Sequence, residues 1–344
     1  MSTPSLDIPS QPAAPAEPEA SRTSPVVRLA RAQRRFPLLQ FAGLVVVFAI
    51  GAATIDGFGS KANIYDMLTL AAFLGFAAAG QTIVVLVGGV DLSIPAMIVL
   101  SGTIIAKFTA DYHWPFIAAL GLAIAAALLT GAITGFVCHF FGGEPLIVTL
   151  GISSVLTGVV QVWTGGFLSA SPPAFLTHLA SPVAKTFGIG FPPVVVLWAV
   201  LALLIGFGLR STAAGQRVYA TGSNPRAARL ALVSTLKVWV GAFALCAVLS
   251  ALTGVLLAGF AAGDQSVGDP YLFESLAAVI VGGTAFGARG DYWRTVLGAL
   301  ILTELTTVLI GHGYSDADQQ MLYGVVILVV VAAYGRERRL RDRV

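Results

Sequence analysis

The sequence predicts an all-α polytopic membrane protein with about ten transmembrane helices. Apolar residues make up 56% of the 344 residues and charged residues only 11%, whereas a soluble domain carries about 25% charged residues. The apolar residues gather in successive runs, most of them near the roughly 20 residues that a helix needs to cross a bilayer. So little charge could not cover the surface of a soluble fold of this size, so that class is excluded.

Residues 1–35 differ in composition from the rest of the chain. Proline alternates there with Ser, Ala and Glu, and Arg28, Arg31, Arg34 and Arg35 follow. This segment has too little apolar area to offset the entropy of ordering, so we expect a disordered cytoplasmic tail. A polar stretch of this length before the first apolar run is not typical of a signal peptide.

Residues 36–335 are predicted to form one transmembrane domain. Its spans are expected near 38–56, 66–87, 94–108, 115–138, 145–164, 191–209, 237–260, 272–288, 293–312 and 318–335. The run at 94–108 is short enough for a half-helix or a re-entrant segment. Eight full spans with broken pieces therefore remain an alternative to ten.

The distribution of Lys and Arg predicts the orientation of the spans. With the N-terminus inside, all but three of the 20 Lys and Arg residues fall on the cytoplasmic side. The exceptions are Lys61, Lys107 and Lys185. Because cytoplasmic segments are enriched in Lys and Arg, both termini are expected in the cytoplasm, the second as a basic tail at 336–344. Residues 165–190 then form a periplasmic loop, and residues 210–236 form a basic cytoplasmic loop.

Two glycine pairs indicate that the halves of the domain are related. Gly88 and Gly89 end one apolar run, and Gly282 and Gly283 end another in the second half. An irregular stretch and a further apolar run follow each pair. Interrupted helices at corresponding places in two halves are typical of a transport pathway, whereas glycine pairs can also serve close helix packing alone.

Sequence motifs for enzymatic chemistry are absent. The chain contains no GxxxxGK[ST] phosphate-binding loop, no HExxH and no CxxC motif. Cys138 and Cys246 lie in apolar runs and offer neither a disulfide framework nor a metal cluster. The net charge of +3 is too small for a nucleic-acid footprint. We therefore expect no catalytic residue, no metal and no nucleic-acid partner.

Acidic residues in apolar surroundings are the strongest candidates for function, because a charge at mid-bilayer costs about 2.5–3.5 kcal/mol on insertion scales. Asp91 follows the first glycine pair, where it can cap the next helix or line a pathway. Glu304 lies near the middle of the 293–312 run with Thr307 beside it. A strip of carboxylate and hydroxyl groups suits hydrogen bonding to a sugar or polyol, and it can equally fix helix packing.

Four segments carry a family resemblance. They are GQTIVVLVGGVDLSIPAMIVLSG (80–102), PLIVTLGISSVLTGVVQVWTGG (145–166), YATGSNPRAARLALV (219–233) and ESLAAVIVGGTAFGARGDYWRTVLGALIL (274–302). They resemble the permeases of ribose/xylose/arabinose-type ABC transporters, over about residues 66–335. The resemblance implies one subunit of an ATP-driven importer of a monosaccharide or polyol in a bacterial inner membrane. It also implies a cytoplasmic ATPase that binds ATP and Mg²⁺, a periplasmic sugar-binding protein, a second permease copy, and no cofactor in this chain.

One of these segments resembles the cytoplasmic loop that docks on the ATPase. The coupling residues implied by this resemblance are Tyr219, Gly222, Ser223, Asn224, Pro225, Arg226 and Arg229. The local chemistry agrees, because Gly222 can end the preceding element, Ser223 or Asn224 can cap a helix, and proline suits a first turn. We expect a short helix from Pro225 to about Leu232 with its arginines outward. The positive-inside bias alone would explain only the arginines.

The expected mechanism is alternating access, with a pathway lined by hydrogen-bonding side chains because sugars are uncharged. The candidates are Gln81, Asp91, Ser93, Thr149, Ser153, Ser154, Glu304 and Thr307. Two alternatives remain. A branched-chain amino-acid-type ABC permease would need groups for a zwitterion, and a self-contained proton-coupled transporter would need an intramembrane acid or histidine relay.

Overall fold

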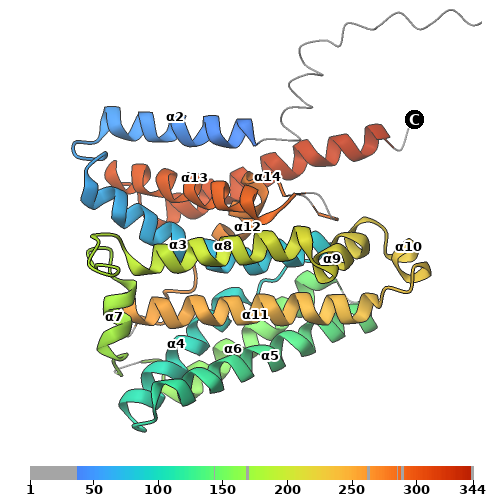
Figure 1. Ribbon diagram of the computed structural model, residues 1–344, viewed down its shortest axis with the longest axis horizontal. Coiled ribbons are helices and arrows are strands. Elements are labelled where there is room, and N and C mark those ends of the chain that lie inside the picture. The colour runs from blue at the N-terminus through green and yellow to red at the C-terminus, as the bar shows by residue number, and fades with distance from the viewer. Residues whose placement is uncertain are drawn as a thin grey trace, which may run out of the picture. The chain divides into compact units, whose positions relative to one another are not determined.

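The computed structural model describes residues 37–142, 144–167, 170–261, 264–284, 286–287 and 290–341, with side chains as far as residue 328. The expected tail at 1–35 lies outside these residues, and so do the side chains of the basic segment at 336–344. The contacts below lie within one compact unit, Leu39–Val344. The regular elements of the described residues are helices, which confirms the all-α prediction (Figure 1).

The predicted spans all correspond to helices. These are α2 (Leu38–Thr54), α3 (Lys61–Val87), α4 (Ile94–Ala110), α5 (Phe116–Phe140), α6 (Pro145–Thr164), α8 (Pro193–Ser211), α11 (Thr235–Phe260), α12 (Tyr271–Val281), α13 (Tyr292–Gly311) and α14 (Asp316–Arg341). Among the described residues, 6 helices are long and apolar enough to cross a membrane, namely α3, α5, α6, α8, α11 and α13. The shorter apolar helices are α2, α4 and α12. The chain is therefore a multi-pass membrane protein.

Helix α12 is shorter than the span predicted at 272–288. It has 11 residues and ends at Val281, so at 1.5 Å per residue it covers about 16 Å, or half of a bilayer core of about 30 Å. Gly283 follows with a left-handed backbone (φ 90°), a conformation that ends helical hydrogen bonding. Helix α4, expected as a possible half-helix, has 17 residues. The half-length helix thus lies in the second half of the chain.

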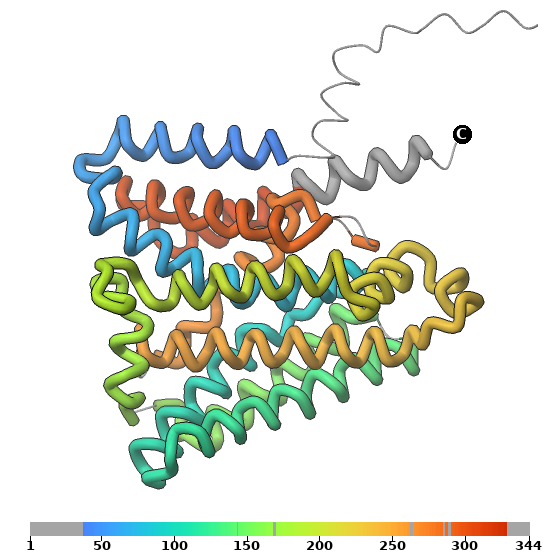
Figure 2. Tube along the Cα trace, in the orientation of Figure 1, coloured from blue at the N-terminus to red at the C-terminus, as the bar shows by residue number. Residues whose placement is uncertain are grey.

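Helices α3 and α11 form the centre of the unit. In the most apolar 18-residue stretch of each helix, 94% of the residues of α3 and 67% of those of α11 are buried, against 17% of those of α6. Helix α11 packs against α3, α4 and α5, and the trace in Figure 2 shows it running beside α5. The central helices are therefore surrounded by protein, whereas α6 presents most of its surface outward.

Small residues bring α5 against α11. Every fourth residue of α5 along this face is Ala or Gly and buried, namely Ala119, Ala123, Ala127, Gly131 and Gly135. A Cβ atom on Gly131 would lie 2.4 Å from the carbonyl oxygen of Phe243 in α11. The two backbones are therefore in direct contact, as is common where membrane helices meet through small residues.

Both long connections contain helices. The outer loop predicted at 165–190 carries α7 (Ala174–Ala180), whose Leu176 and Ala180 are buried. Helix α7 packs against α11. The basic loop predicted at 210–236 carries α9 (Ala213–Ser223) and α10 (Pro225–Leu230). Each loop therefore presents an ordered surface.

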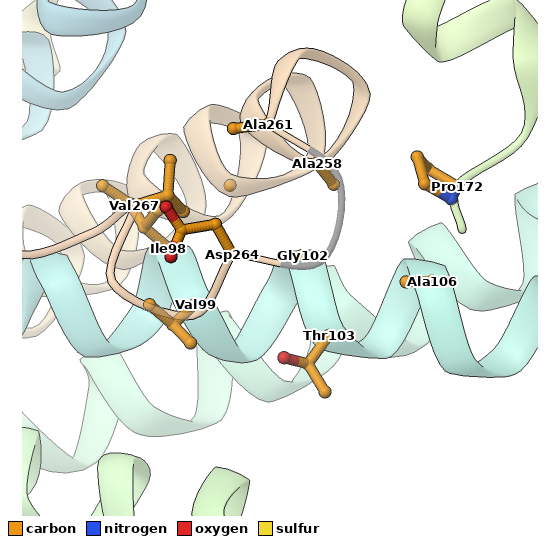
Figure 3. A pocket seen from close by; sticks show the side chains of 11 residues that line it. Ile98, Val99, Gly102, Thr103, Ala106, Pro172, Ala258, Ala261, Asp264 and Val267 are labelled. Atoms are coloured by element: carbon orange, nitrogen blue, oxygen red, sulfur yellow. The ribbon is translucent and has the colours of Figure 1, made fainter. Parts of the chain in front are cut away.

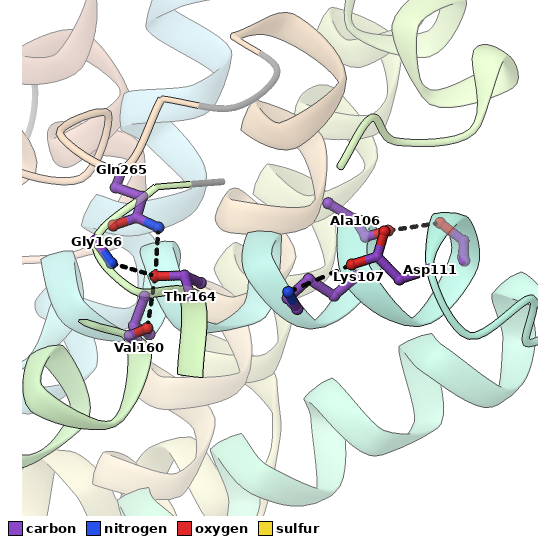
Figure 4. A network of polar contacts seen from close by, with 8 residues as sticks. Ala106, Lys107, Asp111, Val160, Thr164, Gly166 and Gln265 are labelled. Atoms are coloured by element: carbon purple, nitrogen blue, oxygen red, sulfur yellow. Dashed lines mark hydrogen bonds and ion pairs between the residues drawn. The ribbon is translucent and has the colours of Figure 1, made fainter. Parts of the chain in front are cut away.

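Helix ends that the sequence assigns to the outer side lie together. Lys107, near the end of α4, lies 5.9 Å from the ring centroid of Trp163 in α6 and pairs with Asp111 at 3.3 Å. The Thr164 hydroxyl, at the end of α6, accepts a hydrogen bond of 2.9 Å from Gln265, which follows α11. Figure 4 shows both groups in one view. The ends of α4, α6 and α11 therefore share one side of the unit.

Helix ends assigned to the opposite side also meet. The Thr235 hydroxyl, at the start of α11, lies 3.4 Å from Nε2 of His139 at the end of α5. This contact agrees with the predicted opposite directions of α5 and α11.

Candidate functional site

The first helix break is held by a polar cluster. Gly88 ends α3 in a left-handed conformation (φ 97°), and the chain continues without helix as far as Ser93. Oδ1 of Asp91 accepts a hydrogen bond of 2.8 Å from the backbone N–H of Ser93 and another of 2.6 Å from its hydroxyl. The N–H of Asp91 donates to Oε1 of Gln81 at 3.3 Å. Three of the predicted pathway residues therefore meet here.

This cluster is buried against α11. Asp91 is 3% exposed, Gln81 is fully buried, and the Asp91 carboxylate lies close to the Cys246 thiol of α11. Nε2 of Gln81 has no partner among the described residues. Asp91 therefore closes an Asx turn onto Ser93, the residue at the N-cap of α4, whereas among the described residues no side chain caps the first turn of α4 itself. The position of Cys246 beside this cluster could not be predicted from the sequence, because this residue lies in an ordinary apolar run.

The second break touches the first. Its glycine pair also ends a helix, with Gly282 right-handed and Gly283 left-handed. The N–H of Gly287 donates a hydrogen bond of 3.3 Å to the carbonyl of Val85 in the last turn of α3. Asp291 then caps α13 by accepting from the N–H of Arg294 at 3.1 Å. The two interrupted helices therefore meet through backbone atoms.

The second break is also fastened to α8 and α9. The guanidinium of Arg210, near the end of α8, donates a charge-assisted hydrogen bond to Asp291. The Tyr219 hydroxyl of α9 donates to the carbonyl of Gly290 at 3.0 Å. Burial and the Asp291 carboxylate raise the pKa of Tyr219, so its phenol remains a donor at neutral pH. Sequence reasoning missed Arg210 and Asp291 because an ion pair between residues 81 positions apart leaves no local pattern.

The coupling segment forms as two helices that meet at one residue. Oδ1 of Asn224 accepts from the N–H groups of Arg226 and Ala227 at 3.1 and 3.0 Å. Asn224 therefore caps α10, and Pro225 occupies its first turn, as predicted. One expectation was wrong: α9 continues through Gly222 and ends at Ser223. Of the two residues predicted as possible caps of α10, Asn224 is the one that caps it. Helix α10 ends at Leu230 rather than at about Leu232, with both of its arginines exposed.

The candidates on α6 do not join the Asp91 cluster. Thr149 and Ser154 donate to carbonyls of their own helix, at Pro145 (2.8 Å) and Leu150 (3.0 Å). Thr149 is buried, Ser153 is half-buried and Ser154 is exposed. These hydroxyls belong instead to a helix whose surface is largely unburied within this chain.

A second polar cluster joins α12, α13 and α14. The hydroxyls of Thr306 and Tyr323 are hydrogen-bonded to each other, and the Glu274 carboxyl lies close to Tyr323. Two residues before Thr306 on α13, Oε2 of Glu304 is buried without a partner among the described residues. Thr307 donates to Thr303 of its own helix at 2.8 Å. Sequence reasoning missed Tyr323, since it lies within the apolar run of α14.

A small cavity lies between α4 and α11 (Figure 3). Its volume is about 20 Å³, and Val99, Thr103, Ala258 and Asp264 are among its lining residues. A cavity of this size holds about one water molecule, and the Thr103 hydroxyl is a buried group with no partner in the described chain. Small-molecule sites occupy about 300–1,000 Å³, so this cavity is no sugar site.

These features define a multi-pass helical membrane protein with two contacting helix breaks and an exposed short helix, α10. A family described as the permease component of branched-chain amino acid transport systems matches residues 63–331. The chain belongs to this permease family and is a transport subunit. All four segments that carry the resemblance lie inside the matched region.

Several characterised relatives are similar over most of the chain. It is 33% identical over 298 residues to the ribose import permease RbsC of Bacillus subtilis, covering 85% of this chain and 90% of the relative. It is 30% identical over 292 residues to the fructose import permease FrcC of Rhizobium meliloti, covering 83% and 81%. The galactofuranose transporter permease YtfT of Escherichia coli is 31% identical over 274 residues, covering 77% of each chain. No solved structure gives a significant match.

Proposed function

We propose that the chain is the membrane-spanning permease of an ATP-driven, binding-protein-dependent importer of a monosaccharide or polyol. The observation that carries this proposal is the similarity to sugar permeases over more than three quarters of the chain. The family description names branched-chain amino acids, but the names of these relatives favour a sugar. The proton-coupled alternative has only Glu304 in its support and leaves the coupling segment without a role.

The proposed assembly lies in a bacterial inner membrane with both termini cytoplasmic. It pairs two permease copies with a cytoplasmic ATPase that binds ATP and Mg²⁺ and with a periplasmic sugar-binding protein. The outward surface of α6, which carries Ser153 and Ser154, supports a pathway between the two copies. Gln81, Asp91, Ser93, Thr149, Glu304 and Thr307 are proposed to line or brace that pathway.

The coupling segment is proposed to transmit ATPase motion to the helix breaks. Helix α10 presents Arg226, Arg229 and Leu230 to the outside, and Asn224 joins it to α9 without a linker. Tyr219 of α9 is hydrogen-bonded to the second break, which in turn touches the first. A movement of α10 therefore has a continuous bonded route to both breaks.

Replacing Asn224 with alanine is expected to reduce uptake up to about fivefold without changing the amount of protein in the membrane. Loss of a helix cap costs about 1 kcal/mol, or about fivefold in the population of the helix, and a helix as short as α10 is marginal without its cap. The measurement is uptake of labelled ribose, fructose and inositol by cells that carry the complete transporter. Asn224→Ser retains the cap and should retain most of the uptake.

Deleting the ATPase gene tests the proposed function itself. Uptake of one sugar that depends on the ATPase is the expected result, with labelled leucine as the competing cargo. Uptake that continues without the ATPase would overturn ATP coupling, and ATPase-dependent uptake of leucine alone would overturn the sugar assignment.

Replacing Tyr219 with phenylalanine is expected to lower the amount of sugar transported per ATP hydrolysed. The change keeps the ring and removes one hydrogen bond worth about 1 kcal/mol, so the loss should reach at most about fivefold. Uptake and ATP hydrolysis are measured together in proteoliposomes. Tyr314→Phe is the matched control, because Tyr314 is exposed and its hydroxyl forms no hydrogen bond within the described chain. An equal loss in both variants would contradict the route through Gly290.

A further inference from the structure

A large cavity lies beside the coupling segment, apart from both helix breaks. Its volume is about 470 Å³, and it is enclosed by α9, the segment joining α10 to α11, the first half of α11, and Ile83 of α3. That volume falls within the range of about 300–1,000 Å³ typical of small-molecule sites. Neither the predicted pathway residues nor the predicted coupling residues line it.

The lining of this cavity changes from cationic to apolar along α11. Lys237, Gly241 and Leu245 line it at four-residue spacing, so they share one face of the helix over about 12 Å. Arg217 of α9 adds a second cation to the lining. Both cationic side chains are exposed, and neither forms an ion pair within the part of the chain that the structure describes.

We propose that this cavity binds an anionic phospholipid. The lipid phosphate lies between Arg217 and Lys237, and an acyl chain follows Gly241 and Leu245 toward the membrane interior. Basic pockets between transmembrane helices on the cytoplasmic side bind anionic headgroups, and the proposal rests on the proposed orientation, which puts α9 on that side. A sugar would leave both cations and the apolar wall without a counterpart.

The bound lipid would brace α9 against α11. Val218 lines the cavity, and the next residue is Tyr219, whose hydroxyl bonds to the second break. The lipid therefore lies where it can fix the position of α9 relative to α11. Its loss should weaken the packing of α9 before it affects α3 or α5.

Lipid retention tests the site directly. The full-length chain is placed in nanodiscs of phosphatidylcholine with phosphatidylglycerol, and native mass spectrometry measures the phosphatidylglycerol that remains bound. The double variant Arg217→Gln with Lys237→Gln should weaken retention about 30-fold. Each cation near an anionic lipid strengthens binding by about fivefold, and the two factors multiply. Arg226→Gln with Arg229→Gln removes the same charge from α10, outside the cavity, and should leave retention unchanged. Equal retention in both double variants would overturn the proposal.

Filling the cavity tests its apolar end. A Cβ atom on Gly241 would meet no atom within 4 Å, so Gly241→Leu should fold normally and still displace the acyl chain. Gly121→Leu on α5, where a Cβ also meets open space, is the matched control and should retain the lipid. Two results would overturn the lipid assignment. One is that inorganic phosphate alone displaces the phosphatidylglycerol. The other is that Gly241→Leu retains the lipid but no longer forms a permease dimer. Since lipid retention requires no transport, this result stands or falls separately from the sugar assignment.

Discussion

Replacing Gly254 with leucine is expected to destabilise the folded chain strongly. A Cβ atom at this position of α11 would lie 2.1 Å from the carbonyl oxygen of Ile98 in α4 and 2.2 Å from the Ser101 hydroxyl. Backbone atoms cannot move aside as a flexible side chain can, so α4 and α11 would have to separate. That separation would also break the 3.0 Å hydrogen bond from Ser101 to the carbonyl of Ala251. We expect the free energy of unfolding to fall by about 3 kcal/mol, the upper end of the usual cost of overpacking.

The same substitution at Gly241 is the matched control on the same helix. The space around Gly241 is open, and replacing a glycine within a helix removes a cost of up to about 1 kcal/mol. The measurement is the midpoint of thermal unfolding of each variant in detergent, together with the yield of monodisperse protein. Equal yields of the Gly254 and Gly241 variants would contradict the close approach of α4 and α11.

Replacing Asp91 with alanine is expected to destabilise the first break by several kcal/mol. Both donors of Ser93 bond to the same carboxylate oxygen, and each buried donor left without a partner costs about 1–3 kcal/mol. Asp91→Asn keeps an acceptor oxygen in that place and should therefore keep the stability. Thermal unfolding and sugar uptake are measured on both variants.

The pair of variants separates the two roles weighed for Asp91. If the residue only holds the turn onto Ser93, asparagine should support nearly normal uptake and alanine should lose uptake and stability together. Normal stability with lost uptake in Asp91→Asn would contradict this structural role, because it would mean that the negative charge itself is required for transport.

The sequence predicted the features that depend on local pattern. Hydropathy located the helices that became α3, α5 and α13, because the length of an apolar run reflects the thickness of the bilayer whatever lies beside it. Asn224 followed by proline predicted the start of α10, because a helix cap is satisfied by the next two or three residues. Both signals are complete within a few positions of the chain.

Features that depend on distant partners could not be predicted. Helices α6 and α11 both read as apolar runs, yet one is largely outward-facing and the other largely buried, since burial is decided by neighbours. The Tyr323 hydroxyl and Arg210 find their partners only in the folded unit. The end of α12 was placed too late because its glycine pair is followed by further apolar residues that continue the hydropathy signal.

The hydrogen bond between the two breaks, from the N–H of Gly287 to the carbonyl of Val85, has a consequence for how this protein can evolve. Both atoms belong to the backbone, so side-chain substitutions around Val85 leave the bond in place, whereas at position 287 the left-handed backbone (φ 81°) favours glycine and proline would also remove the donor. The residues around the breaks are therefore free to diverge while the register of the two helices is inherited unchanged. Selection can alter the side chains around the breaks without having to rebuild the contact between them.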